Sequence, residues 1–262
     1  MKQDNTTPEV LSAFARLLTI MTELRSKCPW DAKQTIESLK TLTIEETYEL
    51  SEAIDNREAD NIKKELGDLL LHIVFYSEIM AEDGAFSIKD VIESLIEKLI
   101  RRHPHIYGET SVNSSKEVEK RWEEIKMTEG RSSILEGVPT ALPALIKAFR
   151  IQQKVSGVGF DFDDASQAFD KVKEEFAELK DEVDKSNKER IKAEFGDVLF
   201  AVINYGRLLS INAEDALEQT NRKFIKRFRY MENITRQKGK SINGLTIDQM
   251  NILWEQSKKE DL

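Results

Sequence analysis

Cysteine, proline and glycine are scarce in this chain of 262 residues, which holds one Cys, five Pro and 11 Gly. A single Cys cannot form an internal disulfide, and it gives no spacing typical of a zinc site. Proline and glycine interrupt helices, so their low numbers and the charged fraction of 33% favour long helices over a turn-rich β fold. We therefore expect an all-α protein.

Long apolar runs and an excess of positive charge are also missing. The chain has no apolar run of roughly 18 residues, and its start, MKQDNTTPEV, lacks the apolar region of a signal peptide. A net charge of −9 argues against a general nucleic-acid coat and against binding to anionic membranes. We expect a soluble, cytoplasmic protein without nucleic-acid or membrane partners.

Two acidic blocks of equal length repeat one pattern. The first block, residues 45–68, reads EETYELSEAIDNREADNIKKELGD, and the second block, residues 174–197, reads EEFAELKDEVDKSNKERIKAEFGD. Both contain E-E-x-x-E and end in E-x-G-D, and every acid of this pattern recurs 129 positions later. The pairs are Glu45/Glu174, Glu46/Glu175, Glu49/Glu178, Glu65/Glu194 and Asp68/Asp197.

The repetition extends beyond these blocks and indicates a duplicated domain. DVIESLIEKLIRRHPHIY at 90–107 corresponds to DALEQTNRKFIKRFRYME at 215–232, and the copies join at EGRSSILEGVPTALP, 129–143. We predict an N-terminal domain at 1–128, a linker at 129–141 and a C-terminal domain at 142–262, each domain with about four helices. The helices after the blocks contain LLLHIVFY and VLFAVINY, so we expect them to be well buried.

The acids of the second block have the spacing of a ligand set. Residues three apart on a helix share a face, so Glu175 points with Glu178 and Glu194 points with Asp197. If the two helices pack antiparallel, with Gly196 allowing a close approach, four carboxylates converge. Such a group is unfavourable unless cations neutralise it, and oxygen-only ligands select Mg²⁺ or Mn²⁺. A solvated acidic face is the simpler interpretation of one pair but not of two complete copies.

Basic residues distinguish the two blocks. Lys171 and Arg190 each lie one helical turn before a pair of acids in the second block, whereas Leu42 and Asn61 hold these positions in the first. Ordinary surface salt bridges are the alternative interpretation. The difference predicts that the second copy is better equipped to bind a metal-bound polyphosphate.

Further candidates lie after the second block. Lys223 and Arg227 are four apart and can clamp phosphate oxygens from one helical face. Asn204 lies seven residues after Asp197, on the same face, where it can bind a sugar or base or simply hydrogen-bond within the helix packing. Trp254 is either core or a platform for stacking of a base.

These motifs together resemble the MazG family. EETYE…ELGD and EEFAE…EFGD follow CPWD and GVGFD, and RRHPHIYG accompanies the first. The resemblance covers essentially the whole chain. It implies two tandem all-α four-helix domains in a homodimer and Mg²⁺-dependent hydrolysis of nucleoside triphosphates to the monophosphate and pyrophosphate. It also implies broad base tolerance, a role in clearing unwanted nucleotides or alarmones, and catalysis mainly in the C-terminal domain.

The resemblance also assigns residues. The metal ligands would be Glu175, Glu178, Glu194 and Asp197. The nucleotide contacts would be Lys171, Arg190, Lys223, Arg227 and Trp254. Glu174 is a candidate base for the attacking water, next to the catalytic Glu175 and Glu178. The first copy matches at Glu46, Glu49, Glu65 and Asp68 but departs at the flanking positions. The rival hypotheses are a nucleotide sensor without turnover and a helical scaffold.

Overall fold

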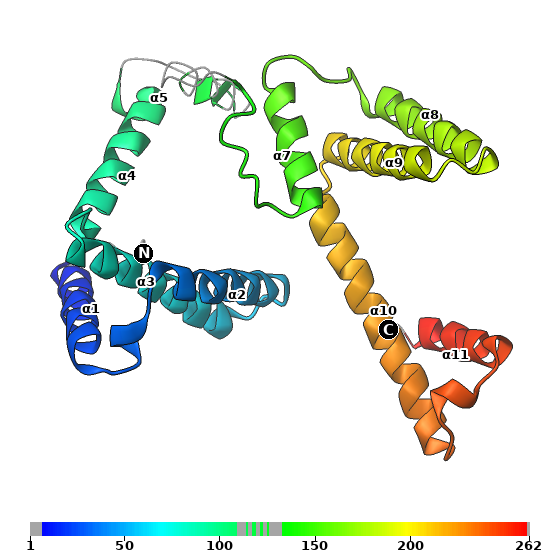
Figure 1. Ribbon diagram of the computed structural model, residues 1–262, viewed down its shortest axis with the longest axis horizontal. Helices are drawn as coiled ribbons and strands as arrows, with labels where there is room; N and C mark the ends of the chain where they lie inside the picture. Colours follow the sequence, from blue (N-terminus) through cyan, green and yellow to red (C-terminus); the bar gives the residue numbers. More distant parts are fainter. Residues whose placement is uncertain are drawn as a thin grey trace. The chain divides into compact units, whose positions relative to one another are not determined.

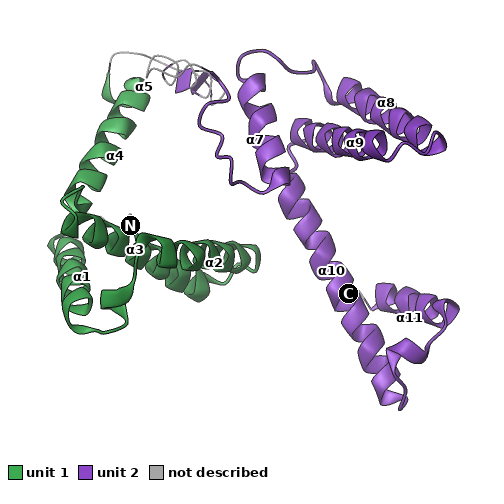
Figure 2. Ribbon diagram, viewed as in Figure 1, with its two compact units in different colours: residues 1–111 green, residues 112–262 purple. Residues whose placement is uncertain are grey.

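The computed structural model describes residues 7–108, 114, 117–118, 121–122, 125 and 133–260. These residues form helices and turns with no strand, which confirms the all-α class (Figure 1). The chain divides into two compact units, residues 1–111 and 112–262 (Figure 2). Residues 129–132 of the predicted linker lie outside the described residues. Over the described ranges, no helix has the length and apolar character needed to cross a bilayer.

The first unit is built around one helical hairpin. Its elements are α1 (Pro8–Lys27), η1 (Asp31–Lys33), α2 (Ile36–Asp55), α3 (Ala59–Glu82), α4 (Ile88–Arg102) and α5 (Pro104–Tyr107). The antiparallel pair α2–α3 makes the most extensive contact in this unit, and α1 packs against α3 (Figure 1). The first acidic block therefore spans the hairpin, with its E-E-x-x-E part on α2 and its E-x-G-D part on α3.

The second unit repeats this hairpin. Its elements are α7 (Ala144–Ser156), α8 (Ala165–Asp184), α9 (Lys188–Leu208), α10 (Ala213–Gln237), η2 (Ile242–Gly244) and α11 (Ile247–Lys259). The α8–α9 pair carries the second acidic block and makes the most extensive contact of the unit. Helix α7 packs against α9 and α10, and α11 packs against α10 (Figure 2).

The turns of the two hairpins have the same backbone geometry. Arg57 ends the α2–α3 turn and Ser186 the α8–α9 turn, each with φ of 58°, in the left-handed region that ends many helices. In both turns the next amide donates to the carbonyl five residues earlier, at 3.0 and 3.3 Å. The repeat seen in the sequence is therefore also a repeat of backbone conformation.

Each hairpin buries only one face of the helix that follows its acids. In the first unit, Val74 and Phe75 of α3 join the core of Met21, Leu39 and Ile79. The expectation that these helices are well buried was wrong, because other apolar residues of LLLHIVFY and VLFAVINY are exposed. These are Leu70 and Ile73 on α3 and Leu199, Phe200 and Val202 on α9. Among these, Phe200 borders a cavity beside α7.

We expect Phe75→Ala to destabilise the first unit by about 3–5 kcal/mol, because removing a buried phenylalanine loses apolar burial and leaves a cavity. Phe75 is 2% exposed. Phe86→Ala is the matched control, because Phe86 is 40% exposed in the same unit, and we expect a loss of about 1 kcal/mol or less. Urea unfolding followed by circular dichroism measures both. Equal losses would contradict the placement of the core.

Candidate active site

The α8–α9 hairpin brings three acids of the second block together. Glu175 and Glu178 lie one turn apart on α8 and face Glu194 on α9. One carboxylate oxygen of each lies within 4.8 Å of the other two. We call these three residues the second-unit acid cluster. Side-chain caps fix where the two helices begin, with Asp164 accepting from the Gln167 amide and Asn187 from the Arg190 amide.

Asp197, the fourth predicted ligand, is one turn after Glu194 on α9 and outside this group of three. Its charge nevertheless acts on Glu194. Burial raises the pKa of Glu194, which is only 9% exposed, and the charges of Glu178 and Asp197 raise it further. Arg190 opposes this shift. The cluster thus has the surplus of negative charge that a cation would relieve.

Two of the predicted basic residues reach the acids. Lys171 Nζ lies 2.7 Å from carboxylate oxygens of both Glu174 and Glu175, and these hydrogen bonds raise the pKa of Lys171. Arg190 Nη1 lies 3.9 Å from Glu194 Oε1. Cations therefore approach the cluster from α8 and from α9. Glu174 itself is exposed and outside the cluster.

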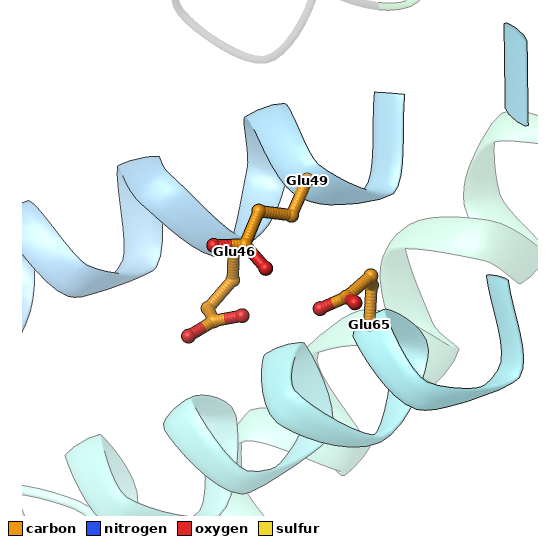
Figure 3. A group of neighbouring side chains, drawn as sticks. All are labelled: Glu46, Glu49 and Glu65. Atoms are coloured by element: carbon orange, nitrogen blue, oxygen red, sulfur yellow. The ribbon is translucent and has the colours of Figure 1, made fainter. Parts of the chain in front are cut away.

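The first unit holds an equivalent cluster of Glu46, Glu49 and Glu65, with one oxygen of each within 4.8 Å of the others. Figure 3 shows these three side chains converging from the two helices. Burial raises the pKa of Glu46, and the charges of Asp68, Glu49 and Glu65 add to the shift. Glu65 Oε2 is buried and has no hydrogen-bond partner among the described residues. We call these residues the first-unit acid cluster.

The first-unit cluster has a cation that the comparison of the two blocks missed. That comparison considered the positions of Leu42 and Asn61, whereas the cation is Lys64. Lys64 Nζ lies 3.0 Å from Glu65 Oε1 and 3.8 Å from Asp68 Oδ2. The available signal was its place four residues before Asp68 on one helix. The two clusters thus share their acids but differ in where positive charge is placed.

The glycines of the two E-x-G-D motifs do not mediate close packing. A Cβ at Gly67 or Gly196 would have no heavy atom within 4 Å in the described structure. Both glycines face outward on their helices, because the acids on either side turn toward the hairpin seam. The expectation that Gly196 allows close approach of the helices was wrong.

The remaining basic and aromatic candidates belong to the α10–α11 pair. The Arg227 guanidinium lies over the Trp254 ring, 5.7 Å from its centroid, and the Phe224 ring is 5.0 Å from that of Trp254. Lys223 is exposed on α10. The structure therefore brings Arg227 and Trp254 together, and the described ring contacts of Trp254 are with α10.

Asn204 lines a cavity of about 320 Å³ between α7, the segment that follows it, and α9. Its Oδ1 accepts a hydrogen bond of 2.9 Å from Arg207 Nε. Gln152 of α7 lines the same cavity and was not a candidate from sequence. Gln152 Nε2 donates to the Phe200 carbonyl, 48 residues further along the chain. No sequence periodicity predicts this contact, since it depends on how α7 packs on α9.

Comparison with known proteins identifies relatives of both units. Residues 34–107 and 160–231 each match the MazG nucleotide pyrophosphohydrolase domain. The nucleoside triphosphate pyrophosphohydrolase/pyrophosphatase MazG of Thermotoga maritima is 45% identical over 253 residues, 95% of this chain and 96% of that protein. The nucleoside triphosphate pyrophosphohydrolase of Escherichia coli K12 is 40% identical over 261 residues, 96% of this chain and 99% of that protein.

The uncharacterized protein YabN of Bacillus subtilis is 42% identical over 254 residues, which make up 95% of this chain and 52% of that protein. The two domain matches fall one in each compact unit, and each spans the acids of one hairpin. The chain therefore belongs to the MazG nucleotide pyrophosphohydrolase family, with one MazG domain in each unit.

Proposed function

We propose that the second unit of this chain hydrolyses nucleoside triphosphates to nucleoside monophosphate and pyrophosphate. The observation that carries the proposal is the second-unit acid cluster, three carboxylates within 4.8 Å with Lys171 and Arg190 reaching it from two helices. The names of the relatives that align over nearly the whole chain support the same activity. The acids act on the phosphates through a bound cation, and Lys171 and Arg190 contact phosphate oxygens rather than the base, so we expect all common bases to be accepted.

Mg²⁺, with Mn²⁺ as a substitute, suits this donor set. All donors are carboxylate oxygens, which hard divalent cations prefer. The electrostatics fit as well, since burial raises the pKa of Glu194 in one cluster and of Glu46 in the other, and neighbouring like charges raise both further. Glu175, Glu178, Glu194 and Asp197 would hold the ion. When bound, it would neutralise phosphate charge and lower the pKa of a coordinated water.

The chain's own residues orient the phosphates and accept the proton. Lys171 and Arg190 bind phosphate oxygens as a point charge and a fork. Lys223 and Arg227 extend the phosphate contacts, and Trp254 contacts the nucleotide from α11. Water adds to phosphorus, the bridging P–O bond between the α and β phosphates breaks, and pyrophosphate leaves. Glu174, exposed beside the cluster, takes the proton of the water at a carboxylate oxygen.

Pyrophosphate release should require a divalent cation. With each of the eight common NTPs and dNTPs, we expect release with Mg²⁺ and none with EDTA, because the acids repel phosphates when no cation neutralises them. Pyrophosphate is measured together with the monophosphate. Release of inorganic phosphate with the diphosphate would overturn the proposed bond cleavage. Absence of turnover with every nucleotide would favour a sensor or a scaffold.

Substitutions at matched acids test which unit is catalytic. We expect Glu178→Ala and Asp197→Ala to lower kcat/KM by about 100-fold or more, since even groups that only orient a metal ligand are typically worth about 10- to 100-fold. Glu49→Ala is the control, because Glu49 is the counterpart of Glu178 in the first-unit cluster. It should retain most activity. Equal losses in the two units would refute the division between them.

We also propose that the protein is a homodimer. Leu66, Leu70 and Ile73 form an exposed apolar stripe on α3, and Phe195, Leu199 and Val202 form the same stripe on α9. Members of each stripe are four and three residues apart, so they share one face. Exposed apolar stripes of this kind are typical of interfaces, and a two-fold axis would pair the α9 stripe with itself.

Light scattering of the purified chain should give twice its mass of 30.1 kDa. We expect Leu199→Asp to halve the measured mass, because it places a charge in the α9 stripe. Lys188→Asp, at the exposed start of the same helix, should leave the dimer intact. A monomeric wild-type chain would refute the proposal.

A further inference from the structure

The cavity beside Asn204 is large enough for a small molecule and mostly apolar. It measures about 320 Å³, within the size range of ligand pockets. Its apolar lining includes Ile151, Val155 and Phe200. Gly159, with φ of 87°, is in the left-handed region in the turn that follows α7, where the Phe160 amide donates to the Val155 carbonyl at 3.1 Å. That turn places Phe160, a residue that is 79% exposed, at the cavity.

Gln152 presents an unused acceptor at this cavity. The residue is only 3% exposed, and its Nε2 donates to the Phe200 carbonyl at 2.8 Å. Because a carbonyl can only accept, this bond fixes which end of the amide is nitrogen. The other end, Oε1, is buried and has no hydrogen-bond donor among the described residues. A buried acceptor without a donor destabilises the fold unless another molecule donates a hydrogen bond to it.

Asn204, on α9, offers a donor at the same cavity. Arg207 Nε can only donate, so the atom it contacts at 2.9 Å is Oδ1 and the free end of the Asn204 amide is the Nδ2 donor. Arg207 is itself held by an ion pair with Asp161, which also accepts from Ser156 Oγ at 2.6 Å. Burial alone would raise the pKa of Asp161, but the bonds from Arg207 and Ser156 keep it below its usual range. The donor is thus fixed in orientation.

We propose that this cavity receives the nucleotide base and favours bases that carry a C=O next to an N–H. Gln152 Oε1 accepts from the ring N–H, and Asn204 Nδ2 donates to the adjacent carbonyl oxygen. Uracil, thymine, guanine and hypoxanthine present this edge. Cytosine and adenine present an amino group beside an unprotonated ring nitrogen, so both interactions are lost. Phe160 offers its ring for stacking.

The position of the cavity along α9 agrees with this role, which rests on the proposed function. Asn204 lies seven residues after Asp197, about 10 Å along the helix axis and on the same face. A triphosphate bound at the second-unit acid cluster would therefore extend its nucleoside along α9 toward the cavity. We expect the preference for this base edge to change the rate of hydrolysis but not to exclude any common nucleotide.

Two matched pairs of substrates isolate the base edge. UTP and CTP have the same ring size, as do ITP and ATP, and each pair differs in the edge described. With Mg²⁺ we expect kcat/KM to be about 10-fold higher for UTP than for CTP and for ITP than for ATP, the factor that one net hydrogen bond typically supplies. Stacking on Trp254 alone would tolerate either edge and give ratios near one.

Asn204→Asp is the decisive variant. Its carboxylate keeps an acceptor for Arg207 but replaces the donor at the cavity with an acceptor. We expect the ratio of kcat/KM for UTP to that for CTP to fall about 10-fold or more. The value for UTP should decrease and that for CTP increase, and the melting temperature should not change. Trp254→Leu should lower kcat/KM for all four substrates by the same factor. Ratios near one in the wild type, or ratios unchanged by Asn204→Asp, would overturn the base pocket while leaving the hydrolase intact.

Binding without turnover separates the two proposals. In EDTA, calorimetry should show tighter binding of UMP than CMP and of IMP than AMP, with the preference lost in Asn204→Asp. If no triphosphate is hydrolysed but this preference is found, the proposed hydrolysis fails and the base pocket stands. Equal affinities within both pairs would overturn the pocket whatever the activity.

Discussion

Repulsion among carboxylates at a helical seam is the constraint on which this structure depends. In each unit three glutamates from two antiparallel helices share a space of a few ångströms, and burial together with neighbouring charges raises the pKa of at least one of them. Nothing in the acids themselves favours this arrangement. The apolar face and the left-handed turn of each hairpin must hold the acids together against their charge, and in the second unit side-chain caps fix the starts of both helices.

The two units meet this constraint with different cations. In the first, Lys64 contacts Glu65 and Asp68 from the same helix. In the second, Lys171 and Arg190 contact the acids from two helices. Equal acids with unequal surroundings are the physical basis for our proposal that the second unit carries the chemistry.

Local periodicity made much of the site predictable. The convergence of Glu175, Glu178 and Glu194 follows from residues three apart sharing a helix face, and the offset of 129 identified the matching set. The exposure of apolar side chains was less predictable, because a run such as VLFAVINY does not show how many of its faces are covered by other helices. Gln152 was out of reach, since its contact with the Phe200 carbonyl depends on how α7 lies against α9.

The turn between the hairpin helices has a consequence for the length of the chain there. Surface loops usually tolerate insertions, but α8 and α9 are joined by a turn whose single left-handed residue, Ser186, fixes their register. One added residue within α9 before Glu194 would rotate that carboxylate by about 100° away from the seam. The spacing between the acids of each hairpin is therefore as restricted as their identity, and a deletion there removes the site without removing any of its residues.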